Sequence, residues 1–270
     1  MTKKLMLTKN QATVIVNLAA LILLFCSGCG QQMTDEQFSL AVRAAGGTCG
    51  VNPQTGAIIV VVDMNSKSDE ILALCCKKKS VVKFIGTDAK ISSEGFASLG
   101  NVENLTHLAI GGSKVSKEDA SNLGKLVHLE NLLLNNSGLT DEAFEHFSSL
   151  RQLKGLSLCD TRATGSGLKY LTNSKRLEVL LLHGSPISDA GLKEIVGFAN
   201  MRELGLNRTN VTNDGVLALA TMPRLGRLAI TGSKVTPEIV EEFKERRSKL
   251  LRDPKNNNSV HIVYFPDSGN

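Results

Sequence analysis

A phrase of twelve residues returns every 24 residues along this chain. It reads LTHLAIGGSKVS at 105–116, LENLLLNNSGLT at 129–140 and LEVLLLHGSPIS at 177–188, and related segments begin at 153, 201 and 225. In each of these six units, aliphatic residues or Met stand at positions one, four and six, and Ser or Thr stands at positions nine and twelve. Self-similarity at a fixed period of this length is typical of a solenoid, in which consecutive units stack on one another.

Positions four and six predict a short strand, because alternate residues of a strand point to the same face. Their members are Leu108/Ile110, Leu132/Leu134, Leu156/Leu158, Leu180/Leu182, Leu204/Leu206 and Leu228/Ile230. The hydroxyl at position twelve predicts a helix N-cap, since a side-chain oxygen there accepts from a free amide of the first turn. Its members are Ser92, Ser116, Thr140, Thr164, Ser188, Thr212 and Thr236. Each unit is therefore expected to run strand, turn, short helix.

Residues Ser188-Asp189-Ala190-Gly191-Leu192 match almost fully the Thr-Asp-x-Gly-Leu phrase of the bacterial 24-residue type of leucine-rich repeat. With its six units in phase, the chain resembles the leucine-rich repeat superfamily over residues 81–250. The resemblance implies an α/β fold, a solenoid with a curved parallel sheet on its concave side and short helices on its convex side. Members usually carry Asn or Cys at position nine, where the Ser or Thr hydroxyl is expected to satisfy backbone groups of the turn.

The repeat divides the chain into parts. Residues 59–250 hold the repeats, of which six are clear and one or two are degenerate. Upstream, a helix that ends at a glycine pair and two strands with a Pro/Gly turn are expected. Residues 29–58 are assigned to an N-terminal α/β cap, because a solenoid end exposes apolar surface unless something covers it. Residues 251–270 contain the alternating segment SVHIVYF and are assigned to a C-terminal cap strand.

Residues 1–28 have the layout of a secretory signal peptide, with three lysines before the apolar run 12–25 and small residues after it. The segment Ser27-Gly28-Cys29 resembles the lipobox of bacterial lipoproteins, although Cys26 stands where that motif has a leucine. The resemblance implies lipidation of Cys29. It also implies an exported lipoprotein, anchored on a membrane of the cell envelope and facing the periplasm or the cell surface. An uncleaved N-terminal anchor is the alternative.

Charge and motifs exclude several classes of function. The formal net charge of +5 falls to +2 without residues 1–28, where 28 Lys and Arg remain against 26 Asp and Glu. This balance, with no basic helix interleaved with aromatics, argues against a nucleic-acid partner. The histidines lie too far apart or lack an acidic or sulfur partner at ligand spacing, and no nucleotide loop is present. No metal, cofactor or small-molecule substrate is therefore predicted.

Positions three, five and seven of each strand are expected to point outward, onto the concave face. Position five is mostly small or apolar, whereas positions three and seven carry many polar residues. We therefore predict a non-catalytic module that binds a protein partner through the following residues of this face: His107, Asn131, Asn135, Cys159, Asp160, His183, Glu203, Asn207, Arg208 and Arg227. An envelope scaffold without a dedicated partner is the alternative, because one repeat scaffold serves unrelated roles.

Cys159, His183 and Asn207 occupy position seven of successive units and match the residue types of the papain-like catalytic set. Neighbouring strands lie about 4.8 Å apart, so the thiol and the imidazole could approach each other. A nucleophile also needs an oxyanion hole and a cleft that excludes water, and regular repeats provide neither. A thiol enzyme using Cys159 and His183 is thus a third hypothesis, and the chain is predicted not to be an enzyme.

Three further cysteines lie near the N-terminal cap. Disulfides persist in exported proteins, so Cys49 is predicted to pair with Cys75 or Cys76 and to pin the cap to the first helix of the repeats. The alternative is that these thiols are small buried hydrophobic groups.

Overall fold

The computed structural model describes residues 33–250 and 260–264. The predicted signal peptide and the lipidation of Cys29 lie outside these ranges. Most of the predicted C-terminal segment 251–270 also lies outside them.

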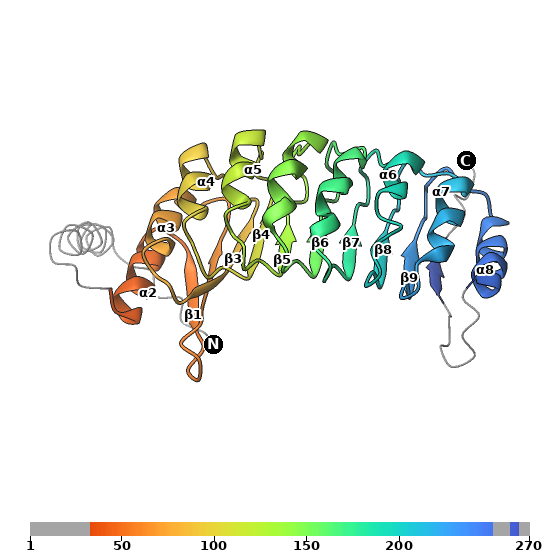
Figure 1. Ribbon diagram of the computed structural model, residues 1–270. Coiled ribbons are helices and arrows are strands. Elements are labelled where there is room, and N and C mark those ends of the chain that lie inside the picture. Colours follow the sequence, from red (N-terminus) through yellow and green to blue (C-terminus); the bar gives the residue numbers. More distant parts are fainter. Residues whose placement is uncertain (1–32, 251–259, 265–270) are drawn as a thin grey trace, which may run out of the picture.

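In the described ranges, ten strands form one sheet and follow one another in chain order (Figure 1). The first two strands pair antiparallel, and every later neighbour is parallel. The strands are β1 (Thr48–Val51), β2 (Ile58–Val62), β3 (Val81–Thr87), β4 (His107–Gly111), β5 (Asn131–Leu133), β6 (Gly155–Ser157), β7 (Val179–Leu181), β8 (Glu203–Gly205), β9 (Arg227–Ala229) and β10 (His261–Val263).

A helix follows most strands, and the helices line up along one side of the sheet (Figure 1). The α-helices are α2 (Asp35–Ala44), α3 (Ser68–Cys75), α4 (Ser93–Leu99), α5 (Lys117–Leu123), α6 (Asp189–Lys193), α7 (Asn213–Ala218) and α8 (Ile239–Leu250). The 3₁₀ helices are η1 (Asp141–Ser149), η2 (Ser166–Asn173) and η3 (Leu219–Thr221). The predicted α/β solenoid, with its parallel sheet, short helices and α/β start, is confirmed.

The core is a stack of aliphatic side chains, one set from each unit. Leu180 lies in β7 and pairs with Leu156 and Leu204 of the neighbouring strands. Leu177 enters the core from the loop before β7, and Leu182 enters it just after the strand, so Leu177, Leu180 and Leu182 are all buried. Fully burying one leucine contributes about 1.5–3 kcal/mol, and the contribution recurs at every unit.

Position eight, just after each strand, has a left-handed backbone. The angle φ is 52° at Asp88, 81° at Gly112, 58° at Asn136, 54° at Asp160, 69° at Gly184, 55° at Arg208 and 67° at Gly232. Six of these seven residues are Gly, Asn or Asp, the types that tolerate this conformation. Arg208 is the exception, and its backbone costs about 1 kcal/mol relative to Gly. The run of Gly, Asn and Asp at position eight is a signal in the sequence that predicts this left-handed turn.

The hydroxyls at position nine bond to the backbone of the turn, as predicted, in several units. Ser185 Oγ donates to the carbonyl oxygen of Leu158 at 2.8 Å and accepts the backbone N–H of Thr161 at 3.0 Å. Thr209 and Ser233 both donate to the carbonyl oxygen of Leu206. The prediction is wrong at Ser137, whose buried Oγ has no hydrogen-bond partner in the described part of the chain.

The predicted N-caps are present at Ser92, Ser116 and Ser188, whose side chains accept from the first turn of α4, α5 and α6. The prediction is wrong for the threonines at the same position, which have no such bond in η1, η2 or α7. Thr164 and Thr212 instead donate their hydroxyls backward, to Asp141 and Asp189 of the preceding unit. A charged acceptor is already in place there, and it makes a stronger bond than a backbone cap.

These backward bonds explain the Thr-Asp-x-Gly-Leu phrase. Asp189 accepts both the hydroxyl and the backbone N–H of Thr212, 23 residues later. A Cβ on Gly215, two residues beyond the next unit's Asn213, would lie 2.1 Å from Asp189 Oδ1. The aspartate therefore joins one unit to the next, and the glycine leaves room for it.

The N-terminal end is closed by α2 and by the β1–β2 hairpin. Thr34 and Gln37 form a reciprocal capping box at the start of α2, and Phe38 and Val42 of this helix are buried in the core. Gly46, with φ of 86°, follows the helix, as the glycine pair predicted.

The C-terminal end is closed by β10, parallel to β9, and by α8. The guanidinium of Arg247 in α8 is buried, with its residue only 3% exposed. It donates to the carbonyl oxygens of Met222 at 2.6 Å and Leu225 at 3.0 Å in the loop before β9. One side chain thus ties α8 to the last unit of the repeats.

Cys49, Cys75 and Cys76 are free thiols in this structure, so the predicted disulfide stays a prediction. Burial strongly raises the pKa of the Cys75 thiol, and the neighbouring Cys76 and Cys49 thiols raise it further. The Cys75 thiol therefore stays protonated at neutral pH and is a poor nucleophile.

Candidate functional site

Strand register arranges the outward side chains in straight rows across the sheet. Each row is named here by the position that its residues occupy in the repeat unit, so that row three holds the residues at position three. Positions three and five of β4 pair with the same positions of β5, and this register continues through β9. Ten residues were predicted to contact a partner, and all of them lie in these rows or at the end of the strands. They are His107, Asn131, Glu203 and Arg227 in row three, Asn135, Cys159, His183 and Asn207 in row seven, and Asp160 and Arg208 in row eight.

Row seven is largely occupied by bonds between units. Asn135 Oδ1 accepts the backbone N–H of Cys159 at 2.9 Å, and Asn207 Oδ1 accepts that of Thr231 at 2.9 Å. His183 Nδ1 accepts the backbone N–H of Asn207 at 3.1 Å. Each of these side chains thus satisfies the amide that follows the next strand. This structural role was not predicted, and contact of these residues with a partner stays a prediction.

The imidazole of His183 is fixed in one orientation. Since Nδ1 accepts a hydrogen bond, the neutral ring carries its proton on Nε2. A Cβ at Gly205 would lie 2.4 Å from this Nε2, so the ring packs against the bare backbone of β8. Burial of the ring, followed by the positive charge of Arg208, lowers the pKa of His183, while Asp160 and Glu203 oppose this shift.

This geometry does not form a thiol–imidazole pair. The side-chain contact of Cys159 Sγ is with Ser157 Oγ at 3.5 Å, and no hydrogen bond joins Cys159 to His183 in the described residues. A general base needs a free lone pair aimed at the nucleophile, but Nδ1 of His183 already accepts from Asn207. Asn207 in turn faces the next unit and does not orient His183 through its side chain.

Row three combines a partly buried histidine with an ion pair. Burial, followed by the charge of Lys83, lowers the pKa of His107, and its Nδ1 lies 2.9 Å from Thr106 Oγ1. At the other end of the row, Arg227 Nε lies 3.6 Å from Glu203 Oε1. Because both side chains of this pair are substantially exposed, the pair contributes little stability and is free to exchange partners.

Asp160 and Arg208 face each other across Gly184 in row eight. Arg208 Nη2 lies 3.7 Å from Asp160 Oδ1, and a Cβ on Gly184 would lie 2.0 Å from that oxygen. The Arg208 side chain stays 69% exposed, and its contact with the aspartate is long and made by one nitrogen. An arginine held here at a strained backbone position is thus available to a carboxylate from outside.

An apolar row runs beside these polar groups. In row five, Val61, Ile85, Ala109 and Leu133 pair along β2 to β5, and the three larger side chains are each 37% exposed. The apolar character of position five is visible in the sequence, but Val61 and Ile85 were not predicted to belong to it. The repeat pattern is degenerate in these units, and only the register of the sheet assigns them to the row.

Other sites receive no support from the described residues. Among them, no three His, Cys, Asp or Glu side chains gather closely enough to hold a metal ion. None of the described helices has both the length and the apolar character needed to cross a bilayer.

Comparison with known proteins supports the fold. No protein-family model matches the sequence, and a comparison with curated proteins finds no match. Internalin C2 of Listeria monocytogenes is similar to this chain, with a TM-score of 0.59, 14% identity and coverage of 94% of this chain and 96% of that one. A second internalin of that organism, InlF, has a TM-score of 0.55 at 14% identity, covering 74% of this chain and 57% of its own. At such identities the likeness is one of fold, and the fold is that of leucine-rich repeat proteins.

Proposed function

We propose that this chain is a non-catalytic protein-binding module, exported and held on a membrane of the cell envelope by a lipid on Cys29, which engages a protein partner on its concave face. The observation that carries the proposal is the exposed apolar row of Val61, Ile85 and Leu133. Clustered apolar side chains on a solvated sheet face are typical of a surface that another protein covers.

Charged groups on the same face support the same proposal. The Glu203–Arg227 and Asp160–Arg208 pairs lie on the C-terminal half of the same face, with long contacts of 3.6 and 3.7 Å. Protein interfaces combine an apolar centre with a polar rim that sets specificity and the rate of encounter. Arginine is also enriched among the residues that dominate binding energy.

The occupied Nδ1 of His183 speaks against the thiol enzyme. It also determines which substitutions test partner binding. Changing His183 or Asn207 would remove bonds between units, so a loss of binding would then be ambiguous. The informative changes are at Ile85 and Leu133, whose exposed side chains make no hydrogen bonds.

The test is affinity capture from an envelope extract with the full chain and with the Ile85→Asp/Leu133→Asp variant. We expect the variant to lose the captured partner at least tenfold, because two buried apolar contacts of an interface together contribute roughly 2–4 kcal/mol. The control is Val127→Asp/Tyr170→Asp, which changes two exposed apolar residues in a helix-to-strand loop and in η2. Equal capture by both variants would contradict the concave face, and capture of abundant neighbours alone would favour the scaffold.

A second test uses charge exchange. The Glu203→Arg/Arg227→Glu variant keeps an ion pair in row three but reverses its direction. The fold should be unaffected, since the pair is exposed. A partner that reads these charges should dissociate faster from this variant, whereas unchanged dissociation would remove row three from the interface.

A further inference from the structure

Charge is sorted between two sides of the solenoid. The helices from α3 to η3 carry ten Asp and Glu against three Lys. The seven loops that run from a helix to the next strand, from Cys76 to Gly226, carry ten Lys and Arg against four Glu. The basic residues of these loops are Lys77, Lys78, Lys79, Lys125, Arg151, Lys154, Lys175, Arg176, Arg202 and Arg224. We call this side of the molecule the basic edge.

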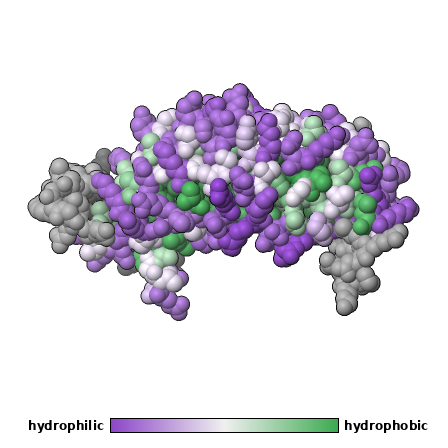
Figure 2. All heavy atoms as spheres, in the orientation of Figure 1, coloured by the Kyte–Doolittle hydropathy of each residue, from purple (hydrophilic) through white to green (hydrophobic). Residues whose placement is uncertain are grey.

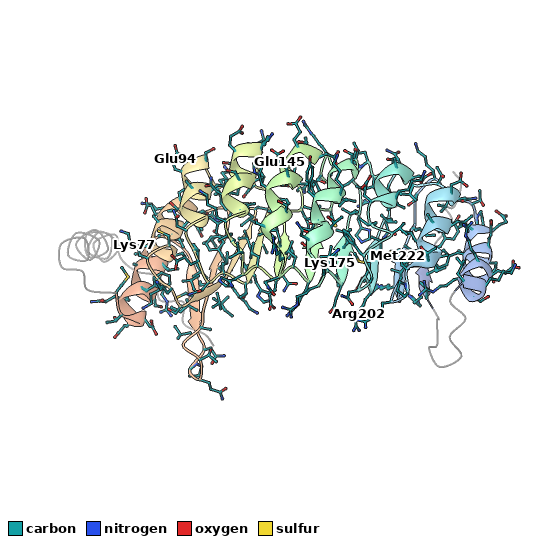
Figure 3. The ribbon with its side chains drawn as sticks, viewed as in Figure 1. Lys77, Glu94, Glu145, Lys175, Arg202 and Met222 are labelled. Carbon is teal, nitrogen blue, oxygen red and sulfur yellow. The ribbon has the colours of Figure 1, made fainter. Side chains whose placement is uncertain are left out.

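The labelled side chains of Figure 3 agree with this separation. Glu94 of α4 and Glu145 of η1 extend from the helical side, whereas Lys175 and Arg202 lie toward the opposite, lower edge (Figure 3). The surface around that lower edge is strongly hydrophilic, and the hydrophobic areas of this view are small and separate (Figure 2).

Much of this positive charge is not neutralised locally. Four of the ten basic residues pair with a carboxylate: Lys78 with Asp35, Lys79 with Glu103, Lys154 with Glu130 and Arg202 with Glu178. For the other six, no carboxylate of the described residues lies within ion-pair distance. Arg176 donates to the neutral amide of Gln152, and Arg224 to that of Asn200. These amides hold the guanidiniums in place and leave their charge uncompensated.

Helix dipoles explain part of this separation of acidic from basic residues. The separation also has an effect on the whole molecule. Acidic residues in the first turn and basic residues after the last turn of a helix are each favourable. In a solenoid, however, every helix points the same way, so the small local preferences add to a field across the whole molecule. Such a field attracts an anionic surface to the basic edge and repels it from the helices.

The start of the described chain lies at this edge. Lys78 Nζ donates to the carbonyl oxygen of Met33 at 2.7 Å and lies 2.7 Å from Asp35. Cys29, the proposed lipidation site, precedes Met33 by four residues, which span at most about 14 Å when fully extended. A lipid on Cys29 therefore keeps this end of the basic edge near the headgroups of the bilayer.

We propose that the basic edge is a docking surface for anionic phospholipid headgroups, which orients the anchored solenoid with its acidic helices away from the bilayer and its concave face open at the side. This inference rests on the membrane anchor of the proposed function. The cations of adjacent loops repeat at roughly 5 Å, the spacing of neighbouring strands, and so present a continuous row to a planar anionic surface. Screening confines the attraction to groups within about 10 Å of the headgroups at 0.1 M salt.

The test is lysine acetylation of the full chain mixed with phosphatidylcholine vesicles, with or without phosphatidylglycerol. On the anionic vesicles, we expect Lys125 and Lys175 to be acetylated at no more than about one fifth of their rate on phosphatidylcholine alone. Lys90 and Lys114, in the strand-to-helix loops, should react equally on both. High salt should abolish the difference, because the screening length falls to about 3 Å at 1 M.

Two variants that lose the same net charge distinguish an effect of the basic edge from an effect of net charge alone. One variant carries Arg151→Gln, Lys175→Gln, Arg176→Gln and Arg224→Gln, and its control carries Lys90→Gln, Lys114→Gln, Arg162→Gln and Lys234→Gln. All eight residues lie in loops of the repeats and none is buried, so circular dichroism and unfolding should be unchanged. Protection of Lys125 should disappear only in the first variant.

Two outcomes would overturn the proposal. One is equal protection of both edges, and the other is protection of Lys125 by soluble polyphosphate but not by anionic vesicles. Partner capture in detergent should be the same for both quadruple variants. A failure of capture alone would thus count against the concave face and not against the basic edge.

Discussion

His183 Nδ1 accepts the backbone N–H of Asn207 at 3.1 Å, across one full unit of 24 residues. The His183 side chain is therefore part of the structure that joins the units. The same bond recurs from Asn135 to Cys159 and from Asn207 to Thr231. Three side chains of row seven thus act as acceptors for amides of the next unit, and the protein-binding surface that we propose lies in rows three, five and eight.

These bonds between units predict how His183 can be replaced. His183→Asn should keep the acceptor, since Asn fills the same position in two other units. His183→Leu should lower the free energy of unfolding at pH 7 by about 1 kcal/mol or more, because the amide of Asn207 loses its partner. Urea unfolding of the two variants checks this, and equal stability would mean that water replaces the bond at no cost.

His183 and His107 also predict a pH dependence. The fold lowers the pKa of both histidines, so the unfolded chain binds protons more readily than the folded one. The free energy of unfolding should therefore fall as the pH drops below about 6.5 and through the lowered folded pKa values. Urea titrations at pH 7.5 and 5.5 measure the slope, which should be shallower in His183→Asn.

At Gly191 we predict that a change from glycine to alanine destabilises the protein, although this change usually stabilises a helix. A Cβ at Gly191 would lie 2.7 Å from both the Cα of Gly165 and the carbonyl oxygen of Thr164. Backbone atoms cannot move aside as a side chain does, so Gly191→Ala should destabilise by about 1–3 kcal/mol, although Ala favours helices over Gly. Gly197, with no atom within 4 Å of its Cβ position, is the control. Gly197→Ala should be neutral or stabilising, and a similar loss in both variants would refute close packing between the units.

We predict that the hydrogen bonds between Asp141 and the next unit are sensitive to acid. It accepts from Thr164 Oγ1 and from the amides of Thr164, Gly165 and Gly167. Burial alone would raise the pKa of Asp141, but these hydrogen bonds outweigh it and hold the pKa below its usual value. Its contribution to stability is therefore complete above the unfolded pKa of about 3.9 and is lost as the pH falls through the lower folded value.

Substitutions separate the charge of Asp141 from its shape. Asp141→Ala should cost about 2–4 kcal/mol at pH 7, since several partly buried donors lose their acceptor. Asp141→Asn should cost less, because Asn213 fills the same position and accepts the amide of Thr236. Urea unfolding at pH 7 and pH 3 should find that the gap between wild type and Asp141→Asn narrows in acid. A constant gap would argue against a charged acceptor.

We predict that the contacts of Arg247 at the C-terminal end limit the stability of the whole solenoid. Arg247→Met removes the donors that hold the carbonyl oxygens of Met222 and Leu225 and should lower the free energy of unfolding by about 3 kcal/mol. Arg246→Met, at the exposed neighbouring residue of α8, should change it by less than about 0.5 kcal/mol. Hydrogen exchange should show β9 and α8 losing protection first, and uniform loss along the chain would contradict a local role.

The repeated units were predictable because the core sets the same demand at each step. Leu, Ile or Met at positions one, four and six fills a similar volume in every unit, so the period is visible without any structure. Hydroxyls at position twelve were visible too, yet Thr164 and Thr212 donate backward instead of capping their own helices. An N-cap depends on residues three apart, whereas the competing aspartate lies 23 residues away and enters the choice only after stacking.

The sequence alone determined the solenoid, the alternation of inward and outward residues along each strand, and which residues face inward. These features follow from the local period and from the burial of apolar side chains. Only the tertiary structure decided what the outward residues do. It assigned His183 to a neighbouring amide, brought Val61 and Ile85 into the apolar row and gathered the lysines and arginines of separate loops on one edge. Hydrogen bonds and electric fields depend on distances between units, and those distances are set by the register of the sheet.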